Sequence, residues 1–274
     1  MKLKKFFSQI YLWVLLAMLY APLLVIAVYS FTEAKTLGNW TGFSLGLYQS
    51  LFTGDSQGAL MAAFKNTLLI ATLASIIATA LGTTAAIGIF NQYNRRKKMV
   101  LNTLNNVPIL NPDIITGVSL FLLFVSLGVT QGYVTLILAH VTFCTPYVVL
   151  SIMPRLQQMN PNTYEAALDL GATPFQAIRK VILPQIRSGM ITGFLLAFTL
   201  SIDDFEVSIF NLGTNGLETL PTYIYADARK GGLTPELRPL LTLIFLAVLL
   251  ILLIVNLRAK KQAEKNNNTK IQTF

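Results

Sequence analysis

The stretch TYEAALDLGATPFQAIRKVILP, residues 163–184, lies between two long apolar runs and decides how the rest of the sequence is interpreted. Its first helix has two alternative starts. Asn160 before Pro161 is typical of an N-cap followed by proline at the first helical position. Asn162 with Glu165 three residues later is a competing capping box, which moves the start two residues along. Either start predicts a short helix.

Gly171, Thr173 and Pro174 predict that a second short helix follows the first. A glycine supplies the left-handed backbone that ends a helix, and a threonine before a proline starts the next one by capping. Pro184 lies near the predicted far end of this second helix. The sequence therefore predicts a compact knob of two helices joined at a glycine, a shape suited to docking into a groove on a partner.

The composition indicates a membrane protein. Of the 274 residues 54% are hydrophobic and 12% are charged, against about 25% charged residues in a soluble domain. Apolar runs of about 20 residues, enough to cross a bilayer, cover residues 10–31, 66–90, 107–127, 133–153, 188–210 and 239–257. The predicted fold is an all-α integral membrane protein with six transmembrane helices. The helical knob is the loop between spans four and five.

The placement of the 21 Lys and Arg residues predicts the orientation. With the N-terminus inside, most of them fall on the inner side, as expected of cytoplasmic segments. The outer side holds Lys35, Lys65, Arg229, Lys230 and Arg238. Both termini and the knob are therefore predicted to be cytoplasmic. A single transmembrane domain is expected over 1–274, with a core near 66–257, an N-terminal span and outer loop over 1–65, and a tail over 258–274.

Acidic residues inside the predicted fifth span are candidates for a transport path, because ionisable groups in a membrane are costly. Asp203, Asp204 and Glu206 have no basic neighbour in the sequence. On a continuous helix Asp203 and Glu206 share one face, and Asp204 points about 100° away. Such a cluster favours a cationic cargo, to which Phe205 adds a cation–π contact. The alternative is that Asp203 and Asp204 are helix-end charges that pack against the partner subunit or fix helix register.

The predicted third span contains Asn111-Pro112-Asp113, with Pro108 before it and Gly117 after it. Prolines and glycine at this depth predict a broken or kinked helix, as transporters have at binding sites. Asp113 is either a second cargo contact or a cap of the helix that follows Pro112. Both roles remain open at this point.

Other functional classes are disfavoured. A single cysteine, Cys144, excludes a cysteine-based metal cluster, and a single histidine, His140, disfavours a histidine-built metal site or a histidine-based enzyme. His140 is expected to be a satisfied, helix-packing residue. No Gly-x-x-x-x-Gly-Lys-[Ser/Thr] sequence occurs, so ATP binding of the P-loop kind is not expected. The basic cluster 95–98 is interpreted as a topology anchor beside anionic lipid, not as a nucleic-acid site.

The knob resembles the "EAA" signature of permease subunits of bacterial ABC importers. That signature is Glu-Ala-Ala, three residues, Gly, nine residues and Ile-x-Leu-Pro, and this chain departs from it only at Val181. The matching positions, which the resemblance assigns to coupling with an ATPase, are Glu165, Ala166, Ala167, Gly171, Leu183 and Pro184. In that family the loop fits a cleft of the cytoplasmic ATPase.

The resemblance implies the partners. They are a second, similar permease, an ATPase dimer that carries the ATP and Mg²⁺, and a periplasmic binding protein, all at the bacterial inner membrane. This chain itself would hold no cofactor and no catalytic residue. The alternative class is an ATP-independent secondary transporter or channel, for which the patterned knob would have no purpose.

Two further stretches narrow the resemblance. The outer-loop run WTGFSLGLY, residues 40–48, is similar to that of polyamine and iron importers, and LSIDDF, residues 200–205, is similar to the fifth span of spermidine/putrescine permeases, above all their "C" subunit. Glu206 departs from the pattern, where an apolar residue is expected. The implied cargo is a polyamine, with ferric iron or thiamine as alternatives, and the periplasmic binding protein would hold much of the specificity.

Overall fold

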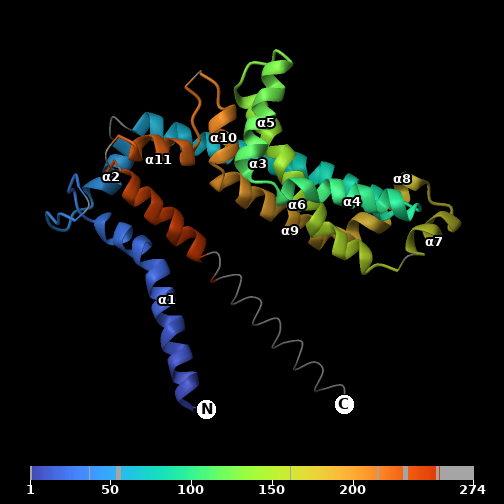
Figure 1. The fold of residues 1–274 in the computed structure, drawn as a ribbon, viewed down its shortest axis with the longest axis horizontal. Coiled ribbons are helices and arrows are strands. Elements are labelled where there is room, and N and C mark those ends of the chain that lie inside the picture. The colour runs from blue at the N-terminus through green and yellow to red at the C-terminus, as the bar shows by residue number, and fades with distance from the viewer. Residues whose placement is uncertain are drawn as a thin grey trace. The chain divides into compact units, whose positions relative to one another are not determined.

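The computed structural model describes residues 2–36, 38–53, 57–160, 162–214, 216–230 and 234–250, together with Leu253. Within these residues all regular elements are helical (Figure 1). The chain divides into two compact units, one made of Met1–Gly58 with Ile224–Phe274 and the other of Ala59–Tyr223. The single transmembrane domain expected from the sequence stays a prediction, and its tail over 258–274 lies outside the described residues.

Four helices in the described part of the chain are long and apolar enough to cross a membrane: Gln9–Tyr29, Gly58–Phe90, Tyr133–Gln157 and Pro174–Asp203. A bent helix pair raises this number to five if the pair is one span. Leu237–Leu250 is a shorter apolar helix, and the prediction places the end of that span in residues the structure does not describe. The all-α membrane fold is confirmed, and the count of six spans stays a prediction.

The larger unit holds most of the helices. They are α3 (Gln57–Phe90), α4 (Arg95–Leu110), α5 (Asp113–Ser126), α6 (Tyr133–Gln157), α7 (Thr163–Asp169), α8 (Pro174–Ala177), a π-helical turn (Ile178–Ile182), α9 (Leu183–Asp203) and α10 (Glu206–Asn211). Helix α11 (Leu220–Ala228) begins in this unit and ends in the smaller one. Figure 1 shows α6 and α9 side by side through the middle of this unit, with α7 and α8 at one end.

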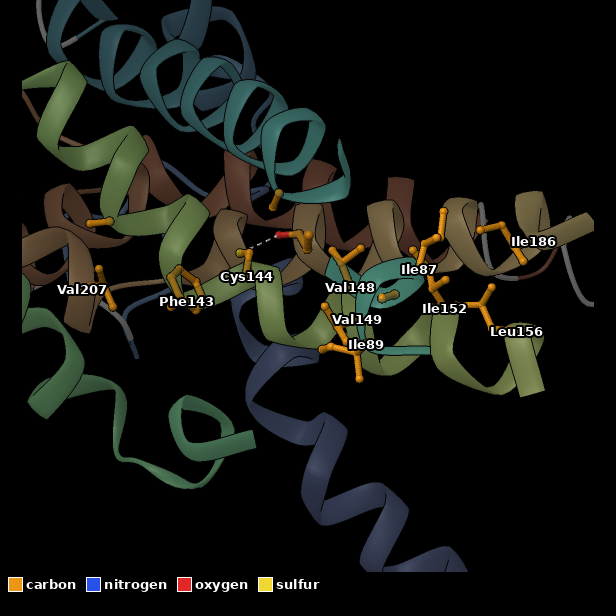
Figure 2. Close-up of a cluster of buried hydrophobic side chains, with 14 of the residues drawn as sticks. Ile87, Ile89, Phe143, Cys144, Val148, Val149, Ile152, Leu156, Ile186 and Val207 are labelled. Atoms are coloured by element: carbon orange, nitrogen blue, oxygen red, sulfur yellow. Dashed lines mark hydrogen bonds between the residues drawn. The ribbon is translucent and has the colours of Figure 1, made fainter. Parts of the chain in front are cut away.

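The core of this unit forms where α6 packs on α9 and α3. Figure 2 shows Val148, Ile152 and Ile186 filling this contact, and the Cys144 thiol donates a hydrogen bond to the Ala197 carbonyl, 3.4 Å away. Close approach depends on Gly82 of α3, because a Cβ built there would lie 2.7 Å from the Val148 side chain. Helices inside a membrane use small residues in this way to pack closely.

The predicted third span is broken, as its prolines indicated. Helices α4 and α5 are bent by 104° relative to each other at Asn111 and Pro112. Asn111 has an extended backbone, and Pro112 stands at the N-cap position of α5 without a side-chain cap. Asp113 is the first residue of α5 and does not cap it. The capping role considered for Asp113 is therefore wrong.

The second helix of the knob does not end near Pro184, as the sequence suggested. Pro174–Asp203 forms one run of 30 residues, in which a π-helical turn joins α8 to α9. The Leu183 amide donates to the Ile178 carbonyl, five residues back. Proline has no amide hydrogen and clashes with the carbonyl four residues back in a regular helix. The wider π turn immediately before Pro184 relieves this conflict, so the proline does not end the helix.

The smaller unit contains α1 (Lys2–Tyr29), α2 (Gly46–Thr53) and the helix Leu237–Leu250. The aromatic residues of its outer-loop run pack on the end of α1: Trp40 meets Tyr29 edge-on at 6.2 Å, and Phe31 stacks on Phe43 at 5.6 Å between ring centroids. The buried Arg238 guanidinium donates to the Ala34 carbonyl at 2.7 Å. This loop is thus fixed by contacts of its own unit.

Candidate functional site: a helical knob and a cluster of carboxyls at two helix breaks

The knob begins at the later of its two predicted starts. Helix α7 starts at Thr163, with Asn162 at the N-cap position but without a side-chain cap. Instead, Asn160 Oδ1 accepts a hydrogen bond from the Asn162 amide at 3.0 Å. The capping box with Glu165 is therefore not formed, and Pro161, part of the other predicted start, lies outside the described residues.

Gly171 ends α7 as predicted. Its φ is +85°, in the left-handed region that favours glycine. The Ala172 amide donates to the Ala167 carbonyl at 3.1 Å and the Gly171 amide to the Leu168 carbonyl at 2.9 Å. These two bonds form a Schellman motif, which satisfies carbonyls that the helix end leaves open. The turn between the two helices is therefore specified by one residue and its immediate neighbours.

The next helix is capped by a reciprocal pair of hydrogen bonds. Thr173 Oγ1 accepts from the Gln176 amide at 3.3 Å, and Gln176 Oε1 accepts from the Thr173 amide at 3.0 Å. This is a capping box. The predicted restart at Thr173 and Pro174 is thus confirmed.

The knob presents apolar side chains outward while its back packs on the core. Leu170 is 89% exposed and Phe175 is 70% exposed. Ala167 and Ala177 are buried, and Tyr164 packs against the core cluster shown in part in Figure 2. A shallow pocket beside the exposed face is lined by Asn160, Asn162, Thr163, Ala166, Ala167, Leu170 and Val181. Exposed apolar residues rimmed by polar ones mark contact surfaces.

The predicted fifth span does not run on to Phe210 as one helix. Helix α9 ends at Asp203, Asp204 has an extended backbone (φ −64°, ψ 123°), and α10 begins at Glu206. The prediction that Asp203 and Glu206 share one helix face is therefore wrong. One physical reason is local: the Asp204 carboxylate accepts hydrogen bonds from amides at the start of the next helix.

Asp204 caps α10 from inside the protein. Its carboxylate accepts from the Val207 amide at 3.1 Å, from the Ser208 amide at 2.8 Å and from the Ser208 hydroxyl at 2.8 Å. Only 5% of its side chain is exposed. Buried carboxylates need such charge-assisted hydrogen bonds. Of the candidate acids, Asp204 is the one whose position the fold specifies most fully.

Packing of α5 on α10 brings the second broken span to the same place. A Cβ built on Gly117 of α5 would lie 2.9 Å from the Glu206 carbonyl oxygen and 3.0 Å from the Val207 Cα. The Asn211 side chain donates to the Gly117 carbonyl at 3.3 Å and is buried. Only glycine permits this backbone approach. Figure 1 shows α5 and α10 adjacent.

The result is a cluster of carboxyls from two helix breaks, here called the acidic cluster: Asp113, Asp203, Asp204 and Glu206. Asp113 lies within electrostatic range of Asp204 and Glu206, and Asp203 within range of Asp204 and Asp113. Asp113, Asp203 and Glu206 are exposed on this chain. Phe205 lies between the two helices of the broken fifth span and is half-buried. Among the described residues, no Lys or Arg pairs with these acids.

His140 is a satisfied, buried residue, as predicted. Its Nδ1 lies 2.6 Å from the Ser201 hydroxyl and its Nε2 lies 3.0 Å from the Ser208 hydroxyl. Sequence reasoning did not connect it with the acids, although Nε2 lies 3.5 Å from Asp204 Oδ2. The sequence does show polar residues within apolar runs, among them His140, Ser201 and Ser208. Their pairing could not be predicted, because it depends on the packing of α6, α9 and α10.

Comparison with known proteins identifies the family. Residues 78–260 match the family described as "Binding-protein-dependent transport system inner membrane component". The chain belongs to this family. The permease is 41% identical over 236 residues to the "Putrescine transport system permease protein PotI" of Escherichia coli K12, covering 84% of this chain and 82% of that protein. It is 36% identical over 256 residues to the "Spermidine/putrescine transport system permease protein PotC" of Haemophilus influenzae, covering 93% and 97%.

Solved structures agree on the fold. The permease superposes with a TM-score of 0.69 on a chain of a bacterial ABC transporter "involved in the import of the acidic polysaccharide alginate", at 12% identity, with 94% and 96% of the two chains covered. The methionine ABC transporter MetNI gives a TM-score of 0.58 at 19% identity, with 74% and 94% covered. Such low identity supports the fold alone. The role rests on the family match and the curated relatives instead: the chain is a transport permease, an inner-membrane component of an ABC importer.

Proposed function

We propose that this permease is one half of the channel of an ATP-driven importer that carries polyamines, putrescine or spermidine, from periplasm to cytoplasm. The observation that carries the proposal is the acidic cluster, in which two broken helices bring carboxyls together without a basic partner in the described residues. A polyamine carries two or more ammonium groups, which such a cluster attracts. The similarity to PotI and PotC, whose names state putrescine and spermidine/putrescine transport, supports the same cargo.

The cargo contacts are Asp113, Asp203 and Glu206, with Phe205 beside them. Their exposure on the isolated chain leaves them free to face a passage shared with a second permease. Asp204 contributes negative charge from behind, because its oxygens are occupied by α10. A cation–π contact at Phe205 would favour an ammonium over a neutral solute.

Energy comes from a partner ATPase dimer, which binds ATP and Mg²⁺ and docks on the knob. The exposed Leu170 and Phe175 flank Gly171 and form the apolar part of that contact. The helical run Pro174–Asp203 leads from the knob directly to the acidic cluster. Closure of the ATPase dimer would therefore move α9. This movement would change the side of the membrane to which the passage is open, which is the alternating-access mechanism.

The orientation follows from the same proposal. Both termini and the knob face the cytoplasm, since most of the 21 Lys and Arg residues fall in the inner segments. The remaining partners are a second, similar permease and a periplasmic binding protein, which delivers the polyamine to the outer face.

The test is uptake of labelled putrescine and spermidine into proteoliposomes that contain the complete complex, with and without ATP. ATP-dependent uptake supports the proposal. A different outcome is that no polyamine is taken up but that a binding protein loaded with ferric iron or thiamine stimulates ATP hydrolysis. That result would show that the cargo is ferric iron or thiamine and not a polyamine. Uptake indifferent to ATP would overturn the mechanism.

Site variants sharpen this test. Asp203→Asn and Glu206→Gln should each raise the apparent KM for polyamine about tenfold, which corresponds to about 1.4 kcal/mol of lost interaction. The matched control is Glu218→Gln, a carboxyl of the same unit outside the acidic cluster, which should leave uptake unchanged. Unaltered uptake in all variants of the acidic cluster would contradict the cargo path.

A further inference from the structure

The break in the fifth span is held from outside by one side chain. Asp203 ends α9 and Glu206 begins α10, so only Asp204, with an extended backbone, and Phe205, with a helical one, separate the helices. The hydrogen bonds of the Asp204 carboxylate all go to the first turn of α10, so they do not tie α10 back to α9. A contact from a third helix can join the two.

His140 of α6 supplies that contact. Its Nδ1 is 2.6 Å from the hydroxyl of Ser201, in the last turn of α9, and its Nε2 is 3.0 Å from the hydroxyl of Ser208, in the first turn of α10. The ring thus bonds to both sides of the break at once. His140 is 1% exposed and meets Phe143 edge-on at 5.5 Å between centroids, so its own position is fixed by packing.

The hydrogen-bond pattern assigns a direction to this chain of contacts. The Ser208 hydroxyl donates its one hydrogen to Asp204 Oδ2 at 2.8 Å, so it can only accept from the histidine. The neutral ring therefore carries its hydrogen on Nε2, and Nδ1 accepts from the Ser201 hydroxyl. The result is one connected path from Ser201 through His140 and Ser208 to Asp204, with each member satisfied.

The groups that face His140 come from every element around it. Asp204 is the nearest charged one, with Oδ2 3.5 Å from Nε2, and within the described part of the chain the ring's hydrogen-bond partners are the two serines. The acids of the acidic cluster differ in exposure. Asp204 is buried in this network, whereas Asp203 and Glu206, on either side of the break, are exposed.

We propose that His140 is a positioning residue for transport: by clamping the break between α9 and α10 it sets where the Asp203 and Glu206 carboxyls meet the cargo. This inference rests on the proposed function, because it assumes that these carboxyls form the cargo path. It adds a residue that touches no cargo, and it assigns the Ser201 and Ser208 hydroxyls to the same task.

The test measures putrescine uptake by the complete complex in proteoliposomes, as apparent KM and maximal rate. His140→Leu should raise KM about tenfold with a smaller loss of maximal rate, since it removes two hydrogen bonds that hold the cluster. His140→Gln keeps one donor and one acceptor and should restore KM to within about twofold. Ser208→Ala should raise KM without removing any charge.

The matched control is Thr142→Val. Thr142 is an exposed residue of the same helix whose hydroxyl bonds only to the Leu138 carbonyl, 2.7 Å away. This variant should have the KM of the unaltered protein. Recovery of each complex in detergent shows whether a variant folds; if His140→Leu does not assemble, Ser208→Ala and His140→Gln carry the test.

A double-mutant cycle separates this inference from the proposed function. If His140 acts through the carboxyls, His140→Leu should change KM less than about twofold in an Asp203→Asn Glu206→Gln background, because the two effects share one cause. Effects that multiply, or a fall in maximal rate with KM unchanged, would overturn the positioning role and leave the cargo path standing. Unaltered KM in the carboxyl variants alone would overturn the cargo path and this role together.

Discussion

The knob and the break in the fifth span are both helix–turn–helix elements, but they are specified in opposite ways. The knob turns at Gly171, and its hydrogen bonds join residues at most five apart in the sequence. The break turns at Asp204 and depends on His140, which is 61 and 68 residues from its two serine partners. A turn built from neighbours can be recognised in a sequence, whereas a turn built by a distant helix cannot.

The largest effect on uptake is expected at the contact between α5 and α10, where the two backbones leave no room for a side chain. Gly117→Leu would push α5 away from the backbone of α10, since even a Cβ there would lie 2.9 Å from the Glu206 carbonyl oxygen. Overpacking of this kind costs about 1–3 kcal/mol, so uptake should fall at least tenfold and the complex should melt at a lower temperature. Gly88→Ala is the control, because a Cβ on Gly88 meets no atom within 4 Å. An unaffected Gly117→Leu would show that the two breaks do not need to meet.

The second effect tests the local turn. Gly171→Val should uncouple ATP hydrolysis from uptake, because a left-handed backbone costs an L-residue about 1–2 kcal/mol. No atom lies within 4 Å of a Cβ at this position, so the strain would be purely conformational. Gly171→Asn should retain most coupling, since asparagine tolerates this conformation. Equal losses in both variants, measured as uptake per ATP hydrolysed, would point to lost contact instead of a lost turn.

The third effect separates an acid that builds the break from one that lines the path. Asp204→Asn should lower the melting temperature of the purified complex, because the carboxylate accepts three hydrogen bonds, two from amides at the start of α10, and each charge-assisted bond is worth about 1.5–3 kcal/mol. Asp203→Asn should leave the melting temperature unchanged while weakening uptake. If both variants melt alike, the division between the two aspartates does not hold.

The smallest effect concerns the cap of α8. Thr173→Ala removes one half of the capping box with Gln176 and should cost about 1 kcal/mol locally. Coupled uptake should fall about two- to threefold, because the knob frays without losing its glycine turn. Thr192→Ala is the control, since the Thr192 hydroxyl bonds only to the carbonyl four residues back in the middle of α9. A loss as large as that of Gly171→Val would make the cap, not the glycine, the main determinant of the knob.

Much of the fold and the knob could be predicted, for a common reason. Helix caps, proline breaks and apolar length are properties of short segments, so Thr173, Gly171 and the break at Pro112 were all recognised correctly. The predicted end of the second knob helix near Pro184 was wrong. Pro184 normally ends a helix, but the π turn before it lets Pro174–Asp203 continue as one run.

The acids show what the sequence determined and what only the tertiary structure decided. Their number and the absence of basic neighbours followed from the sequence alone, and these two facts carry the prediction of a cationic cargo. Which acids are exposed, and that Asp113 lies within electrostatic range of the others, followed from α5 packing on α10 and from the His140 contact across the break. Charge is a property of each residue, whereas burial and convergence depend on segments far apart in the chain, which only the folded chain brings together.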